Sequence, residues 1–387
     1  MADEHDDMAP SFAVSVEDSS LGRGLTELVQ SLEYESVDGI ADEARITLSN
    51  PDFVLADSPI WQPGNQMDVW FGYGTQLGHV GRVVIVQPEP GFPKGDDLPT
   101  ITVKGYTKDQ LMMDESPAQA QASTRDFEAI LIHEAVERIG NKSVYGFDSL
   151  DIDETPGRYA TVQKADMKDY EFVKGLSNLT GYLFWVDYTR PKDGGSGWTL
   201  HFRDPLILLA QENIYTFEYN RGDMSTLLDF FPELALTGTV TKIQAQVRNT
   251  ESGQAPFIVE FADENEAPDI RYRGNPDEVI EEVHTTAGAV VKLFFGDYAL
   301  EVVTDKYFKT EAELRWWAQQ WFRRRRENFI VGRGTVVGIT DLRARQSHKL
   351  TGLCRNLDGS YYFARTRHAF DAGSGYLVDF SARKEIP

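Results

Sequence analysis

The segment DEARITLSNPD, residues 42–52, carries the pattern that decides the fold class. Ala44, Ile46 and Leu48 alternate with polar residues, and a period of two is typical of a half-buried strand. An Asn-Pro-Asp triplet then breaks the strand. The same alternation recurs in SFAVSVED (11–18), NQMDVWFGYG (65–74), HVGRVVIVQPEP (79–90) and DLPTITVKGY (97–106). Strands at this spacing, punctuated by glycine and proline, predict a small antiparallel barrel or sandwich over residues 11–112.

Helical spacing dominates residues 113–210 and predicts an α+β insert. One helix is expected to begin at the segment Ser123-Thr124-Arg125-Asp126 and to run to Ile139. A second is expected to begin near Asp169 and to end at Gly181. The segments GYLFWVDYT and WTLHF, separated by the turn RPKDGGSG, then predict a β-hairpin.

Strand patterns return after the insert and predict a second β unit, built from residues 211–248 and 329–387. The triplet Gly332-Arg333-Gly334 is too short for a phosphate-binding loop and is interpreted as a turn or bulge. Residues 249–328 form an excursion from this unit, and their acidic stretch 249–285 is interpreted as a long loop. Residues 1–10 are expected to be a flexible tail. The predicted fold class is therefore mixed, β-rich α+β.

A strongly marked helix lies in the excursion, at residues 311–326, and Thr310 and Glu313 form a T-x-x-E capping box at its start. Its tryptophans cannot all share one helix face, so one of them is expected to pack against another domain or chain. Aromatic and arginine side chains are enriched at interfaces. The candidate subunit or domain interface is therefore Trp316, Trp317, Trp321, Arg323, Arg324, Arg325 and Arg326. Replacing Trp317 or Trp321 by alanine is expected to cost about 3–5 kcal/mol of folding or assembly stability.

Charge excludes a general nucleic-acid binder. The 387 residues include 38 Lys and Arg against 61 Asp and Glu, a net charge of −23, and such a chain repels nucleic acid unless a basic patch overrides this. The four arginines at 323–326 form the one basic run. Three roles stay open for them: binding nucleic acid, ending the helix while covering apolar surface, or pairing with an acidic neighbouring subunit.

Sequence features also indicate the cellular compartment in which the protein is made. No window holds 18 consecutive apolar residues, so no transmembrane helix and no membrane insertion are predicted. The acidic start MADEHDDMAP is not a signal peptide, which indicates synthesis in a reducing cytoplasm. The single cysteine, Cys354, excludes an internal disulfide and is interpreted as a small buried hydrophobic residue.

No catalytic constellation is visible. Nucleophile elbows, Walker loops and histidine metal-binding spacings are absent from the sequence, so no enzyme activity, cofactor or metal site is predicted. His368, in a strand pattern beside Phe370, is interpreted as a hydrogen-bonded structural histidine. A carboxylate pair for sugar hydrolysis cannot be singled out among 61 acidic residues.

The ordered set of motifs resembles the tail hub (baseplate hub) proteins of contractile-tailed phages, the late control protein D family, and the N-terminal half of type VI secretion spike proteins. The motifs that carry the resemblance are DEARITLSNPD (42–52), DVWFGYG (68–74), GRVVIVQPEP (81–90), LPTITVKGYT (98–107), DYEFVKGLSNLTGYLFWV (169–186), YTFEYNRGDMSTLLDFFPE (215–233), TVTKIQAQV, the helix at 311–326, GRGTVVG, GSYYFARTRHAF and SGYLVDF. They cover nearly the whole chain in the family's order.

The resemblance implies two small antiparallel β-barrels with the α+β insert between them, assembled as a homotrimer whose six barrels form a pseudo-hexameric ring. Such a ring joins the hexameric tail tube protein to the trimeric spike protein, with baseplate wedge proteins outside. DNA would pass the lumen without specific binding, because a negative wall repels phosphate. The implied location is the tail baseplate of the virion.

Two departures and two alternatives accompany the resemblance. The acidic stretch 249–285 matches no family motif, and the chain ends at Pro387 without a fused spike or lysozyme-like domain, so a separate spike protein is expected. The alternatives are a tail-tip cell-wall hydrolase that uses a carboxylate pair and the same hub role in a phage-derived contractile injection system.

Overall fold

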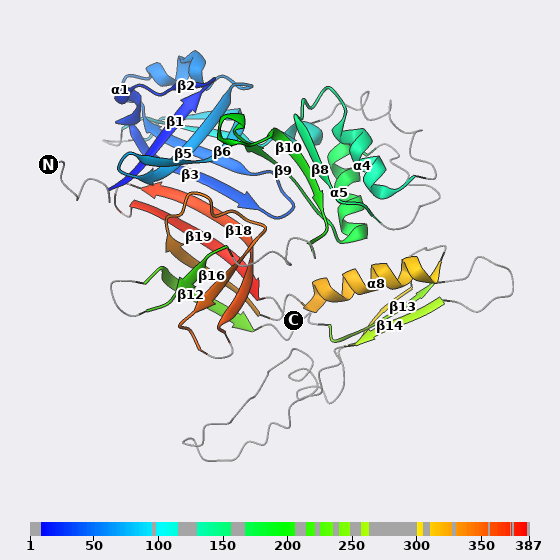
Figure 1. Cartoon of the computed structure of the whole chain (residues 1–387). Coiled ribbons are helices and arrows are strands. Elements are labelled where there is room, and N and C mark those ends of the chain that lie inside the picture. The colour runs from blue at the N-terminus through cyan, green and yellow to red at the C-terminus, as the bar shows by residue number, and fades with distance from the viewer. Residues whose placement is uncertain are drawn as a thin grey trace, which may run out of the picture.

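The structure is a computed structural model that describes residues 9–94, 98–114, 130–155, 167–205, 214–220, 225–234, 240–247, 257–262, 300–304, 310–326, 330–354, 357–371, 373 and 375–384. These residues form a large, mainly antiparallel sheet, two small sheets and a few helices (Figure 1). The prediction of a β-rich α+β fold is confirmed. Within the described ranges, no helix has the length and apolar character needed to cross a bilayer.

The large sheet has 13 strands and joins the two ends of the chain. Its strands are β1 (Pro10–Val16), β2 (Ser19–Ser20), β3 (Val29–Val37), β4 (Glu43–Ser49), β5 (Gln66–Tyr73), β6 (Gln76–Gly91), β7 (Thr100–Tyr106), β11 (Thr216–Glu218), β12 (Leu227–Leu234), β16 (Ile330–Val337), β17 (Gln346–Thr351), β18 (Gly359–Asp371) and β19 (Gly375–Lys384). Short helices connect some of them: α1 (Arg23–Thr26), η2 (Val54–Asp57) and η3 (Pro59–Trp61).

The pairing of β3 with β18 connects the two β units that the sequence presents separately. The spatial order is β12-β16-β19-β18-β3-β4-β7-β6-β5-β1-β2, and β17 pairs with both β18 and β11. Residues 31–37 of β3 therefore lie against residues 365–371 of β18 in antiparallel register. The N-terminal and C-terminal parts of the chain are thus held together by backbone hydrogen bonds.

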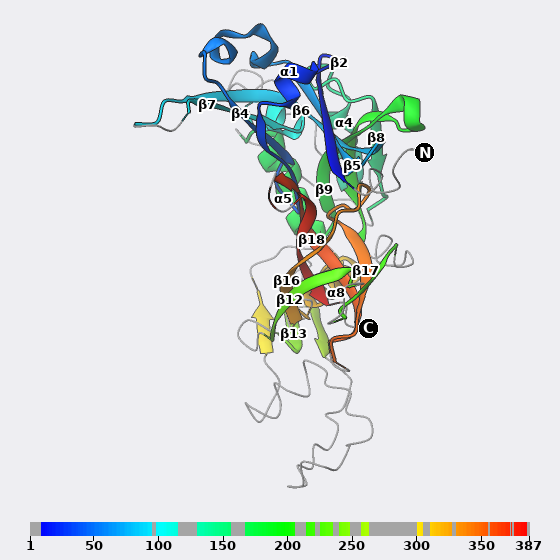
Figure 2. The same ribbon diagram turned by 90° about the vertical axis from the view of Figure 1, so that its left-hand side faces the viewer.

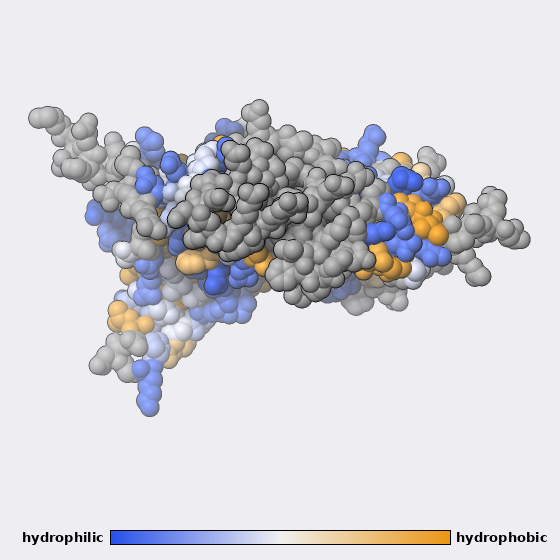
Figure 3. Space-filling view, turned by 90° about the horizontal axis from the view of Figure 1, so that it is seen from below, coloured by the Kyte–Doolittle hydropathy of each residue, from blue (hydrophilic) through white to orange (hydrophobic). Residues whose placement is uncertain are grey.

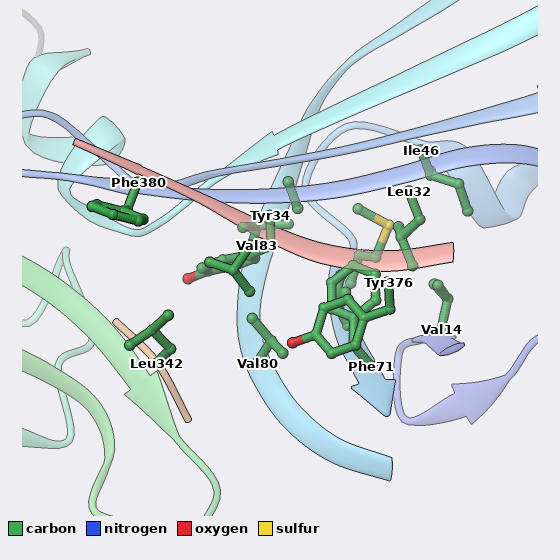
Figure 4. Packing of buried hydrophobic residues seen from close by; sticks show 14 of the residues in the cluster. Val14, Leu32, Tyr34, Ile46, Phe71, Val80, Val83, Leu342, Tyr376 and Phe380 are labelled. Atoms are coloured by element: carbon green, nitrogen blue, oxygen red, sulfur yellow. The ribbon is translucent and has the colours of Figure 1, made fainter. Parts of the chain in front are cut away.

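One face of this sheet encloses the main hydrophobic core (Figure 4). Ala44, Ile46 and Leu48 are fully buried there, as the alternation in β4 predicts. The rings of Phe71 and Tyr376 stack with centroids 4.9 Å apart. Because Phe71 comes from β5 and Tyr376 from β19, the core itself contains both ends of the chain.

Glycines inside β16 leave room for this packing. The interpretation of Gly332-Arg333-Gly334 as a turn or bulge is wrong, because these residues pair in register with β12 and β19. A Cβ atom on Gly332 would lie 2.6 Å from the Phe230 ring, and one on Gly334 would lie 2.5 Å from the Asp229 carbonyl oxygen. Glycine is needed here because an aromatic ring and a neighbouring backbone approach the strand closely.

The insert is a small α+β layer beside the large sheet. It contains α2 (Asp109–Met113), α4 (Ile132–Gly140), β8 (Ser149–Ile152), α5 (Asp169–Thr180), β9 (Leu183–Thr189), η4 (Pro191–Asp193) and β10 (Gly197–Arg203). β10 is the central strand, antiparallel to β9 and parallel to β8. The predicted hairpin is confirmed, and so is the end of α5 at Gly181, whose φ of +84° suits glycine. The expected helix start at residues 123–126 lies outside the described residues.

A third unit contains β13 (Lys242–Val247), β14 (Phe257–Ala262), β15 (Leu300–Val303) and α8 (Glu311–Arg326). β13 pairs with β14 and β15 rather than with the large sheet, and α8 covers one face of the three strands. β14 lies within the acidic stretch that the sequence presented as a long loop. Its residues Phe257 and Val259 face inward beside Ile258, which is exposed, so the alternation of a half-buried strand is present within an acidic context.

Candidate assembly surfaces

A groove of about 900 Å³ lies where the large sheet meets the hairpin of the insert. One wall comes from the first β unit and includes Trp70 and His79, and another comes from β9 and the following turn and includes Tyr188. The third wall is the segment 343–346, which leads into β17 and includes its first residue. Three parts of the chain that are distant in sequence therefore meet at this groove.

Arg345 is the central cation of this junction and is only 8% exposed. Its guanidinium donates to Ser36 Oγ at 2.7 Å and to the Val37 carbonyl at 3.0 Å. It also lies 3.4 Å from each carboxylate oxygen of Asp42. Burial raises the pKa of Asp42 above its usual range, and the nearby Arg345 opposes this effect. The arginine therefore keeps a buried carboxylate compensated, as buried charges require.

Aromatic stacking extends the contacts around Arg345 to residues of the insert. The Arg345 guanidinium lies 5.0 Å from the centre of the Trp185 ring, and Trp185 stacks on His201 with centroids 4.4 Å apart. His201 in turn bonds to Asp151 at 2.9 Å and to Asp187 at 3.1 Å. The groove is thus bordered by a continuous line of contacts that fixes the insert against the sheet.

The carboxylates around the groove are already engaged. Asp42 pairs with Arg345, and Asp187 accepts hydrogen bonds from His201 and the Trp185 indole. Burial raises the pKa of the Asp109 carboxyl to about 7. It is only 1% exposed and does not line the groove. A proton donor and a base facing one substrate, as glycoside hydrolysis requires, are not assembled by these side chains.

Asp109→Asn is expected to stabilise the protein in weakly alkaline solution. The folded carboxyl keeps its proton up to about pH 7, whereas the unfolded chain releases it near pH 4. The carboxyl therefore lowers stability as pH rises through that window. An asparagine stays neutral and still accepts the 2.7 Å hydrogen bond from Thr107 Oγ1. Because its amide group also needs a partner, we expect a net gain of roughly 1–2 kcal/mol at about pH 8.

Urea unfolding of Asp109→Asn and the parent, at about pH 5 and about pH 8, measures this effect. The exposed Asp52 provides the matched control, since Asp52→Asn is expected to change stability equally little at both pH values. An Asp109→Asn gain that does not grow between the two pH values would contradict the argument.

Trp317 and Trp321 of α8 pack within the third unit, whereas Trp316 also contacts the insert. Trp317 is 2% exposed and packs on β13, where Ile243 is fully buried. Trp316 is half-buried and meets Tyr182 of the insert edge-on, with centroids 6.3 Å apart. Trp321 stacks on Trp317 at 5.6 Å and donates its indole N–H to Glu301 at 3.2 Å. Their role at an interface between subunits stays a prediction.

The remaining predicted residues of this helix are only partly described. Arg323, Arg324, Arg325 and Arg326 form the last turn of α8, and their side chains lie outside the described residues, as does the side chain of Glu313 in the capping box. Nothing in the described part of the chain therefore tests the three roles open to the arginine run.

The outer face of the large sheet carries pairs of opposite charge, which lie on neighbouring strands except for Arg45–Glu43 within β4. The pairs are Arg367–Asp379 (2.6 Å), Arg367–Glu33 (3.5 Å), Arg365–Glu35 (2.5 Å), Arg45–Glu43 (2.7 Å) and Lys104–Glu89 (2.9 Å). Because each pair is largely self-neutralising, this face presents hydrated charge without a broad field of one sign.

Exposed apolar side chains mark one end of this sheet. Leu228, Phe231 and Leu234 on the edge strand β12 are 42%, 59% and 58% exposed. A cavity of about 310 Å³ lies beside Phe231, between β12, β16, β18 and β19. Leu234 pairs with the buried Ile330, whereas Phe231 pairs with the exposed Arg333, so these two side chains point to opposite faces of the sheet. We call Phe231 and this cavity the edge patch. Exposed apolar residues on an edge strand are typical of a surface that associates with another chain.

A second apolar group lies on two loops, the one between β4 and β5 that contains η2 and the one between β6 and β7. Phe53, Val54, Phe92 and Leu98 are 50%, 67%, 65% and 59% exposed, and the rings of Phe53 and Phe92 stack at 5.7 Å. Phe53 has a φ of +60°, a strained conformation for a bulky residue. We call these four residues the arm patch, because the β6–β7 hairpin that carries Phe92 projects from the body (Figure 2).

Other exposed apolar residues are scattered. Seen from below, the coloured part of the surface shows small apolar groups among hydrophilic ones (Figure 3). In the third unit, Ile258, Leu300 and Val302 are exposed and pair in register with the polar residues Gln246, Lys242 and Gln244 of β13. The edge patch and the arm patch differ from these groups because one adjoins a cavity and the other projects on an arm.

Comparison with known proteins identifies the fold. Among solved structures, a tail protein from Neisseria meningitidis superimposes with a TM-score of 0.64 at 12% identity over 97% of each chain. The 43 kDa tail protein of prophage MuSo2 from Shewanella oneidensis gives 0.65 at 11% identity, covering 97% of this chain and 98% of that one. No protein-family model and no curated protein matches the sequence.

A third solved structure extends the likeness to secretion systems. The E. coli c3393 protein, a component of the type VI secretion system, gives a TM-score of 0.56 at 11% identity, covering 96% of this chain and 77% of that one. The chain therefore has the fold of phage tail proteins and of this secretion-system component. The resemblance predicted from the ordered motifs is confirmed at the level of the fold.

Two further sequence interpretations have clear outcomes. His368 is fully buried, donates from Nε2 to the Leu342 carbonyl at 2.7 Å and accepts from the Tyr376 hydroxyl at Nδ1, so its structural role is confirmed. Cys354 is exposed, so its interpretation as a buried residue is wrong. The strand pattern misled because β17 ends at Thr351 and the cysteine lies in the turn that follows. Within the described residues, no cluster of three or more His, Cys, Asp or Glu side chains is arranged to hold a metal ion.

Proposed function

We propose that this chain is a structural hub of a contractile tail baseplate, which joins the tail tube to the spike. The observation that carries the proposal is a fold shared over 97% of this chain with two phage tail proteins. The engaged state of the groove carboxylates supports a structural role, because the charged groups of the described groove hold parts of the chain together.

In this proposal three copies form a ring. Each copy contributes two β-barrels, one from each β unit, and the six barrels present near-sixfold symmetry to the tail tube protein above and threefold symmetry to a spike protein below. Wedge proteins surround the ring in the baseplate of the virion. The chain is made in the host cytoplasm before assembly.

The lumen of the ring would let DNA pass without holding it. We assign the outer face of the large sheet as a candidate wall, because Arg45, Arg365 and Arg367 on it are paired with carboxylates at 2.5–3.5 Å. An arginine already bonded to a carboxylate has little capacity left for phosphate, and the chain as a whole carries a net charge of −23. The same ring suits a phage-derived contractile injection system, and neighbouring genes would distinguish the two.

Light scattering on a sizing column tests the hub. We expect a native mass three times the 43.6 kDa of the chain, because the exposed edge patch and arm patch need partners to be covered. Imaging of that species is expected to show a ring with a central opening.

The contrary outcome is equally specific. A species that remains a monomer with its spike and tube partners present, and that releases soluble fragments from peptidoglycan, would contradict the hub and favour the cell-wall hydrolase. A trimer without such release would leave the hub as proposed.

A further inference from the structure

The edge patch and the arm patch lie toward opposite ends of one sheet. β12 is the last strand at one end of the spatial order, and the β6–β7 hairpin lies toward the other. A contact between two such different surfaces on neighbouring copies is heterologous, and repeated heterologous contacts close into a ring when the rotation permits. The positions of the two patches are therefore those that a cyclic assembly requires.

The shapes of the two patches are complementary. The arm patch is convex, with Phe92 65% exposed on a projecting hairpin (Figure 2). The edge patch is concave, since its cavity of about 310 Å³ lies beside Phe231, and its lining combines apolar residues such as Val331 and Ala364 with charged ones such as Arg333. A cavity of this volume is at the lower end of the range that holds small ligands, and its apolar lining residues suit an aromatic side chain.

Proline makes a contact through side chains more favourable than strand addition. The unpaired side of β6 beyond Val84 contains Pro88 and Pro90, and the edge strand β12 contains Pro232. Proline has no N–H to donate to a neighbouring strand. Each edge therefore lacks donors where a continuous ladder would need them, and association has to come from side chains.

Charges of both signs border each patch, since Lys94 is exposed close to Phe92 in the chain and Glu233 and Arg383 line the cavity. Asp52 and Asp57 are exposed and flank the apolar residues of the arm patch. Arg333 is exposed at the cavity and forms no ion pair with any residue that the structure describes. Opposite charges at the rim of an apolar contact orient the two surfaces, and an arginine beside an aromatic anchor is a frequent interface combination.

We propose that the arm patch of one copy docks on the edge patch of a second copy, with Phe92 entering the cavity beside Phe231. Asp52 or Asp57 then approaches Arg333 of the second copy. The proposal rests on the proposed function, since it assigns the contact that builds the trimer. It predicts a head-to-tail ring in which every copy uses both patches once.

Cross-linking between two different single-cysteine variants tests the contact. Cys354→Ser first removes the exposed native thiol. Leu98→Cys then labels the arm and Glu233→Cys labels the rim of the cavity, and both leave Phe92 and Phe231 intact. With a short bismaleimide, we expect dimers when the two variants are mixed and none from either variant alone. Val144→Cys, 56% exposed on the insert, replaces the arm variant in the control mixture and is expected to give none.

A second measurement uses the anchor itself. Phe92→Ala is expected to weaken self-association about tenfold or more, because it removes the aromatic side chain that fills the cavity, whereas Val144→Ala is expected to leave self-association unchanged. Circular dichroism of both variants shows whether each is folded. Normal self-association of a folded Phe92→Ala variant would overturn the proposal.

The outcomes of these experiments distinguish a failure of this contact from a failure of the proposed hub function. Dimers from Leu98→Cys alone would show an isologous contact and overturn the proposal. Trimers without any cross-link in the mixture would overturn this contact and leave the hub standing. A parent chain that stays monomeric at its highest soluble concentration, without cross-links, would overturn both the contact and the self-assembled trimer.

Discussion

Arg345→Ala is expected to lower the free energy of unfolding by about 3–5 kcal/mol, the cost of leaving a buried charge without its partner. The arginine is 8% exposed and reaches Ser36, Val37 and Asp42. Its removal also takes away the cation beside Trp185. The junction between the sheet and the insert would therefore lose its ion pair, two further hydrogen bonds and a stacking contact at once.

The loss is expected to depend on pH in a definite direction. Burial already raises the pKa of Asp42, and Arg345 opposes that rise. Without the arginine the pKa of Asp42 rises further, so the variant is expected to lose most stability in weakly alkaline solution and least where Asp42 is protonated. Urea unfolding of variant and parent across this range measures the difference, and an equal loss at every pH would contradict the assigned role.

Two further variants distinguish the contribution of the Arg345 side chain from that of its backbone conformation and from the loss of an exposed arginine. Arg345 has a φ of +69°, so glycine is expected to be about 1 kcal/mol less destabilising than alanine at this position. Arg333→Ala removes an exposed arginine that forms no ion pair with any described residue, and its effect on the fold is expected to stay within about 0.5 kcal/mol.

Local pattern predicted much of the fold. Ala44, Ile46 and Leu48 alternate and are buried as expected, and α5 ends at a glycine with positive φ. Pairing between distant strands was beyond such patterns. The sequence of β3 does not predict that β18 is its neighbour, because any two strands with alternating apolar residues can form the same backbone hydrogen bonds.

The contacts that build the candidate surfaces were even harder to predict from the sequence than the strand pairing. Arg345 and Asp42 are separated by 303 residues, and no local rule connects them. The dense tryptophans of residues 311–326 did signal packing on more than one surface, and Trp316 and Trp317 indeed lie against different units. The sequence did contain an indication of the edge strand that carries the edge patch. Pro232 lies among apolar residues, and a proline in such a pattern is typical of an edge strand.

Glycine was the residue most easily misread. In a strand it indicates either a bend or a close approach, and sequence alone does not distinguish them. Gly332 and Gly334 face Phe230 and the Asp229 backbone, which the pairing of β12 with β16 brings close. Their role follows from a neighbour that lies about 100 residues earlier in the chain.

Trp317→Ala is expected to cost about 3–5 kcal/mol, the usual loss on emptying a buried aromatic site. The side chain is 2% exposed between α8 and the sheet of β13, β14 and β15, and it supports Trp321 by stacking. A small sheet covered by one helix has few other large side chains to fill the space, so the cavity is expected to persist and the third unit to loosen first.

Hydrogen exchange followed by mass spectrometry measures where the loss falls. Faster exchange in peptides from β13 and α8, with unchanged exchange in β3 and β18, is the expected result. Arg315→Ala on the exposed side of the same helix is the matched control, since its ion pair with Glu311 at 3.2 Å is exposed and contributes little. A Trp317→Ala variant that unfolds like the parent and assembles normally would show that this tryptophan supports neither the unit nor the ring.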